Sequence, residues 1–152
     1  NLKNYINLRF NGAFGKFEPD RKIFTKMINT FYIAGKNEFE IYGNGNNLID
    51  AMYIDDAVNG FLKVINNIDV KNTIVDFCLG KPQSINELVT KTAAGFGVKR
   101  LSIRHKCESF EPIQFTNSPE KMYELFGFKP KTRIETGITT FAEFLIEQKN
   151  SR

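Results

Sequence analysis

Thr73-Ile74-Val75-Asp76-Phe77-Cys78-Leu79 is a nearly continuous apolar run, as expected for a strand that is covered on both faces. A second run, Tyr5-Ile6-Asn7-Leu8-Arg9-Phe10, opens the chain and also predicts a strand. Between and after the two runs, apolar residues recur at helical spacing. Strands that alternate with helices indicate an α/β fold with a parallel sheet.

The spacing of apolar residues, and the turn residues between apolar segments, predict the remaining helices and strands. Helices are expected over residues 21–34, from Asp55 or Asp56 to Ile65, and over residues 84–94, 120–126 and 135–148. Shorter strands are expected over residues 39–42, 48–54 and 101–104.

Capping residues set several of these helix boundaries. Ser84 and Glu87 form a Ser-x-x-Glu capping box at the start of one helix. Asp55 or Asp56 is expected to cap the helix that ends near Ile65. That helix should carry its apolar residues on one face, namely Val58, Phe61, Leu62 and Ile65.

Composition places the chain among ordinary globular proteins. Its 152 residues suit about one domain, and 41% of them are hydrophobic. The net charge of +4 is dispersed along the chain, whereas nucleic-acid-binding proteins usually gather Lys and Arg on one stripe. No apolar stretch approaches the roughly 20 residues of a membrane helix. We therefore expect a cytoplasmic protein with neither nucleic acid nor a membrane as its partner.

The start of the chain suggests a piece of something longer. The first residue is Asn1, and the opening strand has almost no lead-in.

Cysteine and histidine are too few to predict a metal site. The chain holds Cys78, Cys107 and one histidine, His105, whereas a structural zinc site takes four ligands. Cys78 lies inside an apolar run and is expected to be a buried, inert thiol. A nucleophile pair of Cys107 and His105 is the alternative, without an identifiable third member.

No motif predicts a self-sufficient active site. Tyr32 and Lys36 match Tyr-x-x-x-Lys, but Gly35 interrupts the turn between them, so the two side chains need not share a face. Gly43-x-Gly45 lacks the third glycine and the helix of a dinucleotide-binding loop. Asp55 and Asp56 at a helix start suit a cap better than a catalytic pair.

Several segments in fixed order carry a family resemblance. They are Arg9-Phe10-Asn11-Gly12-Ala13-Phe14-Gly15, residues 39–45 and residues 50–57, followed by Leu79-Gly80 with Ser84 to Leu88, residues 118–125, and Phe126 to Pro130 with Glu135 to Ile138. Together they resemble the carboxyl-terminal part of extended short-chain dehydrogenases, the NAD-dependent epimerases and dehydratases of nucleotide sugars. The resemblance covers nearly the whole chain.

The resemblance implies that different parts of the intact protein bind the substrate and the cofactor. Residues 1–152 would form the substrate-binding lobe, and residues 5–10 and 73–79 would add the last strands to a doubly wound, Rossmann-like NAD(P)-binding sheet. The amino-terminal half of that sheet, with the glycine-rich loop and the catalytic Tyr-x-x-x-Lys, would be absent. No catalytic residue is therefore expected in this chain, and the chain alone should be inactive.

Site residues follow from the same resemblance. Phe10 and Asn11 would contact NAD or NADP, which the missing half would bind for the most part. The nucleotide-sugar substrate would contact Asn11, Phe14, Lys16, Arg21, Lys22, Glu40 and Tyr42. For Glu40, an ordinary edge strand is the alternative.

The sequence departs from the family at two arginine positions. Ile49 stands where an arginine often grips the substrate diphosphate, and a second arginine expected near residues 110–112 is also missing. Lys16, Arg21, Lys22 and Arg104 are the cations that remain available. Arg9 resembles an arginine that pairs with the aspartate at Asp56.

The resemblance thus implies the carboxyl-terminal part of an NAD(P)-dependent nucleotide-sugar epimerase or dehydratase that is a homodimer when intact. The alternative is a non-catalytic module that binds a sugar nucleotide or a protein partner.

Overall fold

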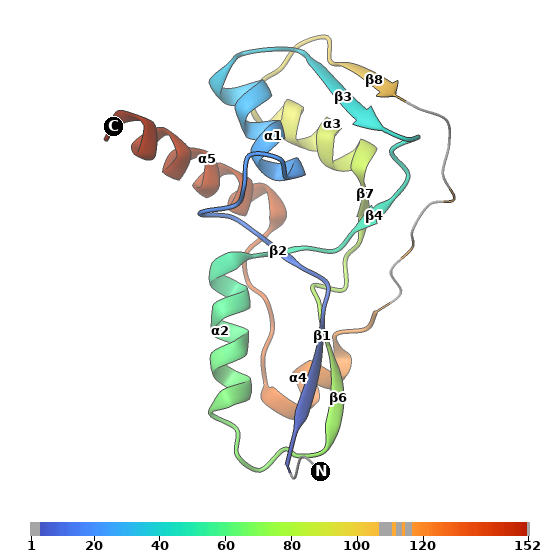
Figure 1. Ribbon diagram of the computed structural model, residues 1–152, viewed down its shortest axis with the longest axis vertical. Helices are drawn as coiled ribbons and strands as arrows, with labels where there is room; N and C mark the ends of the chain where they lie inside the picture. The colour runs from blue at the N-terminus through green and yellow to red at the C-terminus, as the bar shows by residue number, and fades with distance from the viewer. Residues whose placement is uncertain (1–3, 107–110, 112–113, 115–116, 152) are drawn as a thin grey trace.

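The computed structural model describes residues 4–106, 111, 114 and 117–151. The molecule is elongated, with one group of elements at each end (Figure 1). Strands β1 (Ile6–Phe10) and β6 (Thr73–Phe77) lie at one end with helices α2 (Ile54–Ile65) and α4 (Glu120–Phe126). Strands β3 and β8 and helices α1, α3 and α5 form the opposite end. The predicted α/β class is confirmed.

Strands β1 and β6 are the two apolar runs of the sequence, and they pair in parallel. Ile6 lies opposite Thr73, and Phe10 lies opposite Phe77. One face of the pair packs on the helices, in a cluster that includes Met52, Ala57, Val64, Val75, Phe77, Met122, Phe126 and Phe128. The other face is not covered as the sequence predicted, because Ile74 remains 48% exposed.

The opposite end holds the larger core. Strand β3 (Glu38–Tyr42) pairs in parallel with β8 (Ser102–Lys106), next to helices α1 (Ile23–Ile28), α3 (Ile85–Gly95) and α5 (Ile134–Asn150). The predicted helix over residues 21–34 is divided, because α1 passes into a π-helical turn, η1 (Asn29–Ile33), in which Ala34 N–H donates to the Asn29 carbonyl. The core includes Phe14, Met27, Ile28, Val89 and Phe141.

Two pairs of short strands connect the ends of the molecule. Strand β2 (Ala13–Phe14) pairs in parallel with β5 (Met52–Tyr53), and β4 (Leu48–Ile49) pairs in antiparallel with β7 (Gln83–Ser84). The chain therefore passes between the two cores directly after β1 and again before α2.

Helix α2 corrects two sequence predictions. Tyr53 is its N-cap residue, and neither Asp55 nor Asp56 provides a side-chain cap. The buried Asp56 carboxylate instead accepts hydrogen bonds from the Lys131 and Thr132 N–H groups, at 3.0 and 2.7 Å. The predicted apolar face is largely exposed, because Ala57, Gly60 and Val64 face the core in its place.

Gly60 allows α2 to lie close to the sheet. A methyl group at position 60 would be 2.5 Å from Cζ of Phe77 and 2.8 Å from Cε1 of Phe128. Any side chain at this position would therefore push the helix away from β6.

The capping box at α3 is present as predicted. The Ser84 hydroxyl accepts from Glu87 N–H at 3.2 Å, and the Glu87 carboxylate accepts from Ser84 N–H at 2.8 Å. The hydrogen bond from the Ser84 backbone lowers the pKa of Glu87 from its ordinary 4.5.

Ser84→Ala is expected to reduce the free energy of unfolding at pH 7 by about 1 kcal/mol, since it removes this cap. Because the pKa of Glu87 is lowered in the folded state, the stabilisation is present above pH 4.5 and is lost as pH falls through the folded-state pKa. Urea unfolding between pH 3 and pH 7 measures both effects, and Ser102→Ala, on β8, is the control. A deficit for Ser84→Ala that is as large at pH 3 as at pH 7 would contradict the role of Glu87.

Candidate functional site

Polar groups meet where β1 and β6 end. Asn11 follows β1 directly, and Gly80 and Lys81 come shortly after β6. Because β1 and β6 are parallel, both segments lie at the carboxyl edge of the sheet, where open α/β sheets bind their ligands. Asp50, from the segment between β4 and β5 that connects the two ends of the molecule, joins them.

Asp50 organises this edge. The residue is 4% exposed, and its carboxylate accepts from Gly80 N–H at 2.9 Å and from Lys81 N–H at 3.4 Å. The Asn11 amide also donates to it, at 3.5 Å, and Asn117 donates to the Asn11 carbonyl oxygen at 2.7 Å. We call Asn11, Asp50, Gly80, Lys81 and Asn117 the strand-end network. It fixes the orientation of the Asn11 side chain.

Cys78 lies beside the strand-end network but is chemically inert there. Its side chain is fully buried, and burial, followed by the charges of Asp50 and Asp76, raises the pKa of the thiol to about 12. The thiol therefore stays protonated at neutral pH and is no nucleophile. This confirms the predicted buried thiol; Cys107, of the alternative pair, is outside the described residues.

A basic hollow adjoins the strand-end network. It has a volume of about 350 Å³ and is lined by Leu79, Lys81, Gln83 and residues 130–135. Lys81, Lys131 and Arg133 contribute positive charge, and the Arg133 guanidinium lies 3.7 Å from the Glu135 carboxylate. Ligand pockets commonly measure roughly 300 to 1,000 Å³, so the hollow has room for part of an anionic metabolite.

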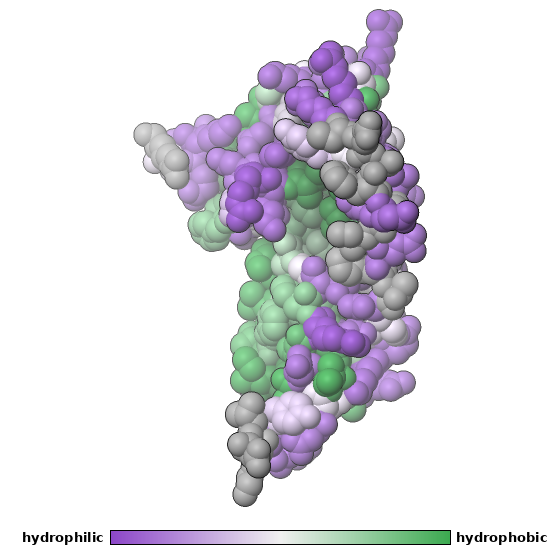
Figure 2. Space-filling view, turned by 45° about the vertical axis from the view of Figure 1, so that its right-hand side comes forward, coloured by the Kyte–Doolittle hydropathy of each residue, from purple (hydrophilic) through white to green (hydrophobic). Residues whose placement is uncertain are grey.

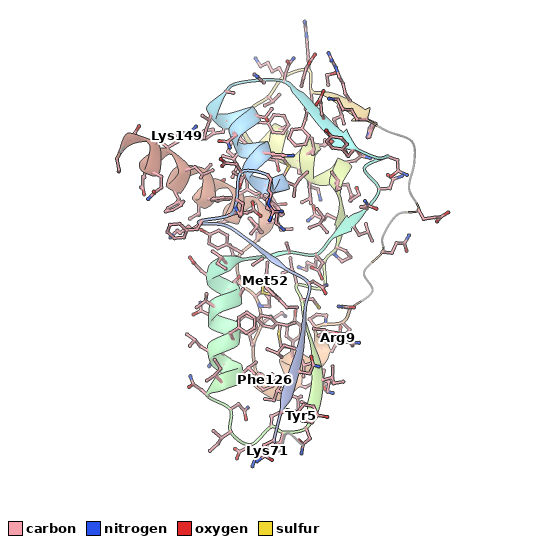
Figure 3. The ribbon with its side chains drawn as sticks, viewed as in Figure 1. Tyr5, Arg9, Met52, Lys71, Phe126 and Lys149 are labelled. Atoms are coloured by element: carbon pink, nitrogen blue, oxygen red, sulfur yellow. The ribbon has the colours of Figure 1, made fainter. Side chains whose placement is uncertain are left out.

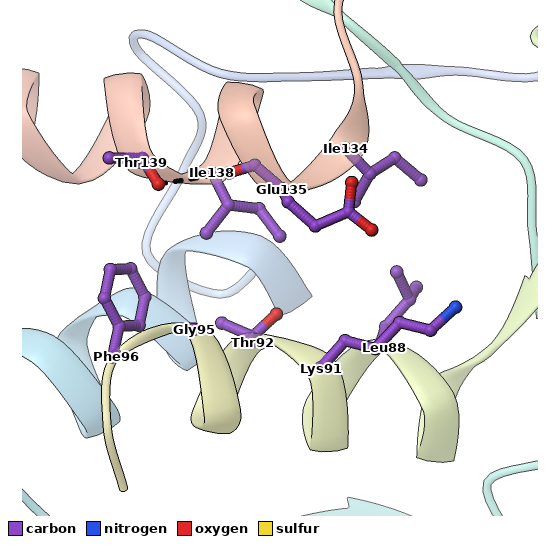
Figure 4. Close-up of a pocket in the computed structure, with 9 residues that line it drawn as sticks. All are labelled: Leu88, Lys91, Thr92, Gly95, Phe96, Ile134, Glu135, Ile138 and Thr139. Carbon is purple, nitrogen blue, oxygen red and sulfur yellow. Dashed lines mark hydrogen bonds between the residues drawn. The ribbon is translucent and has the colours of Figure 1, made fainter.

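A second hollow, between α3 and α5, is too small for such a ligand. Figure 4 shows Leu88, Thr92 and Phe96 facing Ile134 and Ile138 across it. Its volume is only about 60 Å³. The Thr92 hydroxyl is buried there without a hydrogen-bond partner among the described residues.

Glu40 and Tyr42 lie on β3, on the face that alternates with buried Phe39 and Ile41. The Glu40 carboxylate forms an ion pair with Lys106 Nζ at 2.7 Å, and this hydrogen bond raises the pKa of Lys106. Tyr42 is 65% exposed, so its ring is available to a ligand. The hydrogen bonds that we describe for the strand-end network include neither of these two side chains.

The other predicted contacts are scattered. Phe10 packs against Phe61 and Phe77, with ring centroids 5.4 and 5.3 Å apart, while remaining 41% exposed. Phe14 lies in the core, stacked on Phe24 at 4.1 Å, so its ring is not open to a ligand in this conformation. Lys16, Arg21 and Lys22 are exposed around the loop before α1.

Arg9 pairs with a different aspartate from the one predicted. Its Nε atom lies 2.6 Å from Asp76, its cross-strand partner on β6, whereas Asp56 is occupied by backbone N–H groups. Arg9 is on β1 in the lower part of Figure 3. Arg104, considered as a free cation, pairs with Glu38 at 3.0 Å.

The Tyr32 and Lys36 pair does not form a catalytic unit. Tyr32 belongs to η1 and stacks on Phe96, with centroids 4.8 Å apart. Gly35, with a φ of +61°, ends the helical backbone between the two residues.

A family model extends these observations. The model of the NAD dependent epimerase/dehydratase family matches residues 3–80, just over half of the chain. The chain belongs to this family. The match includes β1, α2 and β6, as well as Asn11, Asp50 and Gly80 of the strand-end network.

Two relatives match nearly the whole of this chain. An uncharacterized protein of Methanocaldococcus jannaschii, MJ1055, is 28% identical over 146 residues, which are 95% of this chain and 44% of that protein. GDP-L-colitose synthase of Yersinia pseudotuberculosis is 24% identical over 155 residues, 98% of this chain and 49% of the synthase. The chain thus spans about half the length of the curated relatives it matches.

Solved structures support the fold. The structure of MoeE5 in complex with UDP-glucuronic acid and NAD superposes with a TM-score of 0.79 and 22% sequence identity. The superposition covers 94% of this chain and 47% of MoeE5.

Two further properties concern only the described part of the chain. None of its helices is both long and apolar enough to span a bilayer. It also contains no group of three or more His, Cys, Asp or Glu side chains that could hold a metal ion.

Sequence reasoning missed the centre of the strand-end network. Asp50 was matched to the family without a role, and Asn117 was not considered. A useful signal was available for Asp50, since a lone carboxylate in the apolar stretch from Leu48 to Ile54 must find donors when it is buried.

Proposed function

We propose that this chain is the substrate-recognition part of an NAD(P)-dependent nucleotide-sugar epimerase or dehydratase. One observation carries the proposal. The strand-end network holds the Asn11 amide at the carboxyl edge of a parallel sheet, next to a basic hollow, in a chain that belongs to this family. That edge is where a dinucleotide and the substrate beside it would be bound.

The described residues fit NAD or NADP only in part. Phe10 and Asn11 lie at the strand end where the nicotinamide portion would be held, but the glycine pairs of this chain do not open a helix as a pyrophosphate-binding loop does. Most of the dinucleotide would therefore be held by another nucleotide-binding half. When bound, the dinucleotide supplies the hydride acceptor for the reaction.

This chain would bind and orient the sugar nucleotide. Tyr42 offers an exposed ring for stacking on the nucleotide base, with Glu40 beside it on β3. Lys16, Arg21 and Lys22 offer cations for the diphosphate, since Ile49 cannot. Asn11, held by Asp50 and Asn117, would donate to the substrate or the nicotinamide. We assign no catalytic residue to this chain and expect no turnover by it alone.

The family resemblance also motivates the proposal of a cytoplasmic homodimer for the intact enzyme. The names of the similar proteins support a nucleotide-sugar ligand, because one is a GDP-L-colitose synthase and another is seen with UDP-glucuronic acid.

Isothermal titration with UDP-glucose, dTDP-glucose and a GDP-hexose tests the function. One of the three is expected to bind the 152-residue chain, and Tyr42→Ala should weaken that binding about tenfold through loss of base stacking. Tyr32→Ala removes another half-exposed tyrosine, stacked on Phe96, and should leave the affinity unchanged. Equal losses for both variants, or no binding of any nucleotide sugar, would refute the proposal.

A further inference from the structure

Positively charged side chains gather over two adjoining hollows. The first is the basic hollow beside the strand-end network, and the second, of about 500 Å³, is lined by α2 and by the segment after α4. Lys131 lines both hollows, so they adjoin at this residue. We call the cations of the two hollows the basic band, which comprises Lys63, Lys81, Lys129, Lys131 and Arg133. The fold thus brings together cations that the sequence spreads over residues 63–133.

Asp56 fixes the centre of the basic band. Its carboxylate accepts from Lys131 N–H at 3.0 Å and from Thr132 N–H at 2.7 Å, which holds the Lys131 backbone against the first turn of α2. Nearby, Lys129 Nζ lies 5.7 Å from the centre of the Tyr123 ring, within the range of a cation–π contact. The backbone of one cation and the ammonium group of another are therefore held in place before a ligand binds.

The basic band has few counter-charges. Among the described residues that line the two hollows, only Asp56 and Glu135 are acids, so the five cations leave a formal excess of three positive charges. Lys63, Lys81 and Lys131 form no ion pair within the described part of the chain. Clefts lined by charge of one sign concentrate ions of the opposite sign. The basic band is therefore suited to an anion.

Helix α2 lines its hollow with a polar side. Asn59 and Lys63 of α2 and its C-cap residue Asn66 lie four and three residues apart, so they share one side of the helix, and all three line the hollow. Hydrophobic side chains gather at this end of the molecule in Figure 2, but the exposed Val58 and Ile65 of α2 do not line the hollow. The two asparagine amides add neutral donors to the charge of Lys63.

We propose that the basic band binds a linear oligophosphate, with phosphate groups in both hollows and Lys131 between them. Four of the five cations are lysines, which bind phosphate as point charges. A single-stranded nucleic acid suits the band less well, because its bases stack on exposed aromatic rings. Phe128 supplies the one aromatic ring among the described lining residues, and it is only 7% exposed.

This site goes beyond the proposed function and does not depend on it. The proposed function assigns the substrate diphosphate to Lys16, Arg21 and Lys22, around the loop before α1. It leaves the cations of the basic band without a ligand. The oligophosphate is therefore a second ligand of the chain.

Isothermal titration of the 152-residue chain with tripolyphosphate and with inorganic phosphate tests the site. Tripolyphosphate is expected to bind at least about tenfold more tightly, because its linked phosphate groups occupy both hollows. Lys131→Gln should weaken tripolyphosphate binding about tenfold, since it removes a charged donor shared by the two hollows. Lys149→Gln removes the same charge near the end of α5, away from the basic band in Figure 3, and should leave the affinity unchanged.

Two further variants show whether both hollows contribute. Lys63 lines only the hollow at α2, and Arg133 lines only the other one. Lys63→Gln and Arg133→Gln should each weaken tripolyphosphate binding at least about threefold. Citrate, a carboxylate anion, should bind more weakly than tripolyphosphate. Circular dichroism checks that the variants fold.

Four results would overturn the proposal. They are tripolyphosphate binding no tighter than that of phosphate or citrate, equal losses for Lys131→Gln and Lys149→Gln, no loss for Lys63→Gln or Arg133→Gln, and tighter binding of an oligothymidylate than of tripolyphosphate. A nucleotide sugar that displaces tripolyphosphate would also overturn it, because the two ligands would then share one site. Tripolyphosphate binding by a chain that binds no nucleotide sugar would contradict the proposed function alone.

Discussion

Asp50→Ala is expected to lower the free energy of unfolding by about 3 kcal/mol, because it leaves buried donors without an acceptor. Asp50 is 4% exposed, and its carboxylate accepts from Gly80 N–H at 2.9 Å and Lys81 N–H at 3.4 Å. Removing it would free the segment after β6 and release the Asn11 side chain at the same time. Stability and ligand binding should therefore fall together.

Urea unfolding of the purified variants measures this effect. Asp50→Asn retains one acceptor oxygen and should lose about half as much stability as Asp50→Ala. Asp69→Ala, an exposed aspartate after α2, is the control and should change the free energy of unfolding by less than about 0.5 kcal/mol. If Asp50→Ala were as stable as Asp69→Ala, the strand-end network would have no structural role.

Phe77→Ala is expected to cost about 3 to 5 kcal/mol of stability, the largest effect of any substitution considered. The Phe77 ring has no exposed surface and contacts Phe10, Phe61 and Phe128. It joins both strands of the sheet to α2 and to the segment after α4. A cavity at this position would therefore remove contacts with all three rings and weaken the packing of the smaller core.

Thermal unfolding monitored by circular dichroism checks the loss. Phe17→Ala removes the same side chain from an 82% exposed position, where the ring makes an edge contact with Phe144, and should have little effect. Comparable losses for the two variants would contradict the role of Phe77 as the centre of this core.

Local signals predicted much of the fold. The apolar runs that became β1 and β6 have few alternatives to a strand, and Ser84 with Glu87 satisfies the first turn of α3 by itself. The exposed face of α2 was not predictable in this way. Helical spacing shows which residues share a face, but the face that packs is decided by Phe77, which requires the small Gly60 opposite it.

The candidate site was harder to predict than the fold. Asn11 was selected through the family resemblance, and its position after β1 supports that choice. Its partners Asp50 and Asn117 are 39 and 106 residues away in the sequence. Spacing rules act over a few turns of chain, so they carry no information about such contacts. The same limit explains why Arg9 was assigned to Asp56 and not to Asp76.

Because Gly60 has no side chain, it also determines how close α2 lies to the sheet. A bulkier residue at position 60 would move α2 away from Phe77 of β6 and from Phe128, which follows α4, at the same time. The position therefore controls how closely the parts of the smaller core pack together, although glycine contributes no side chain to that core.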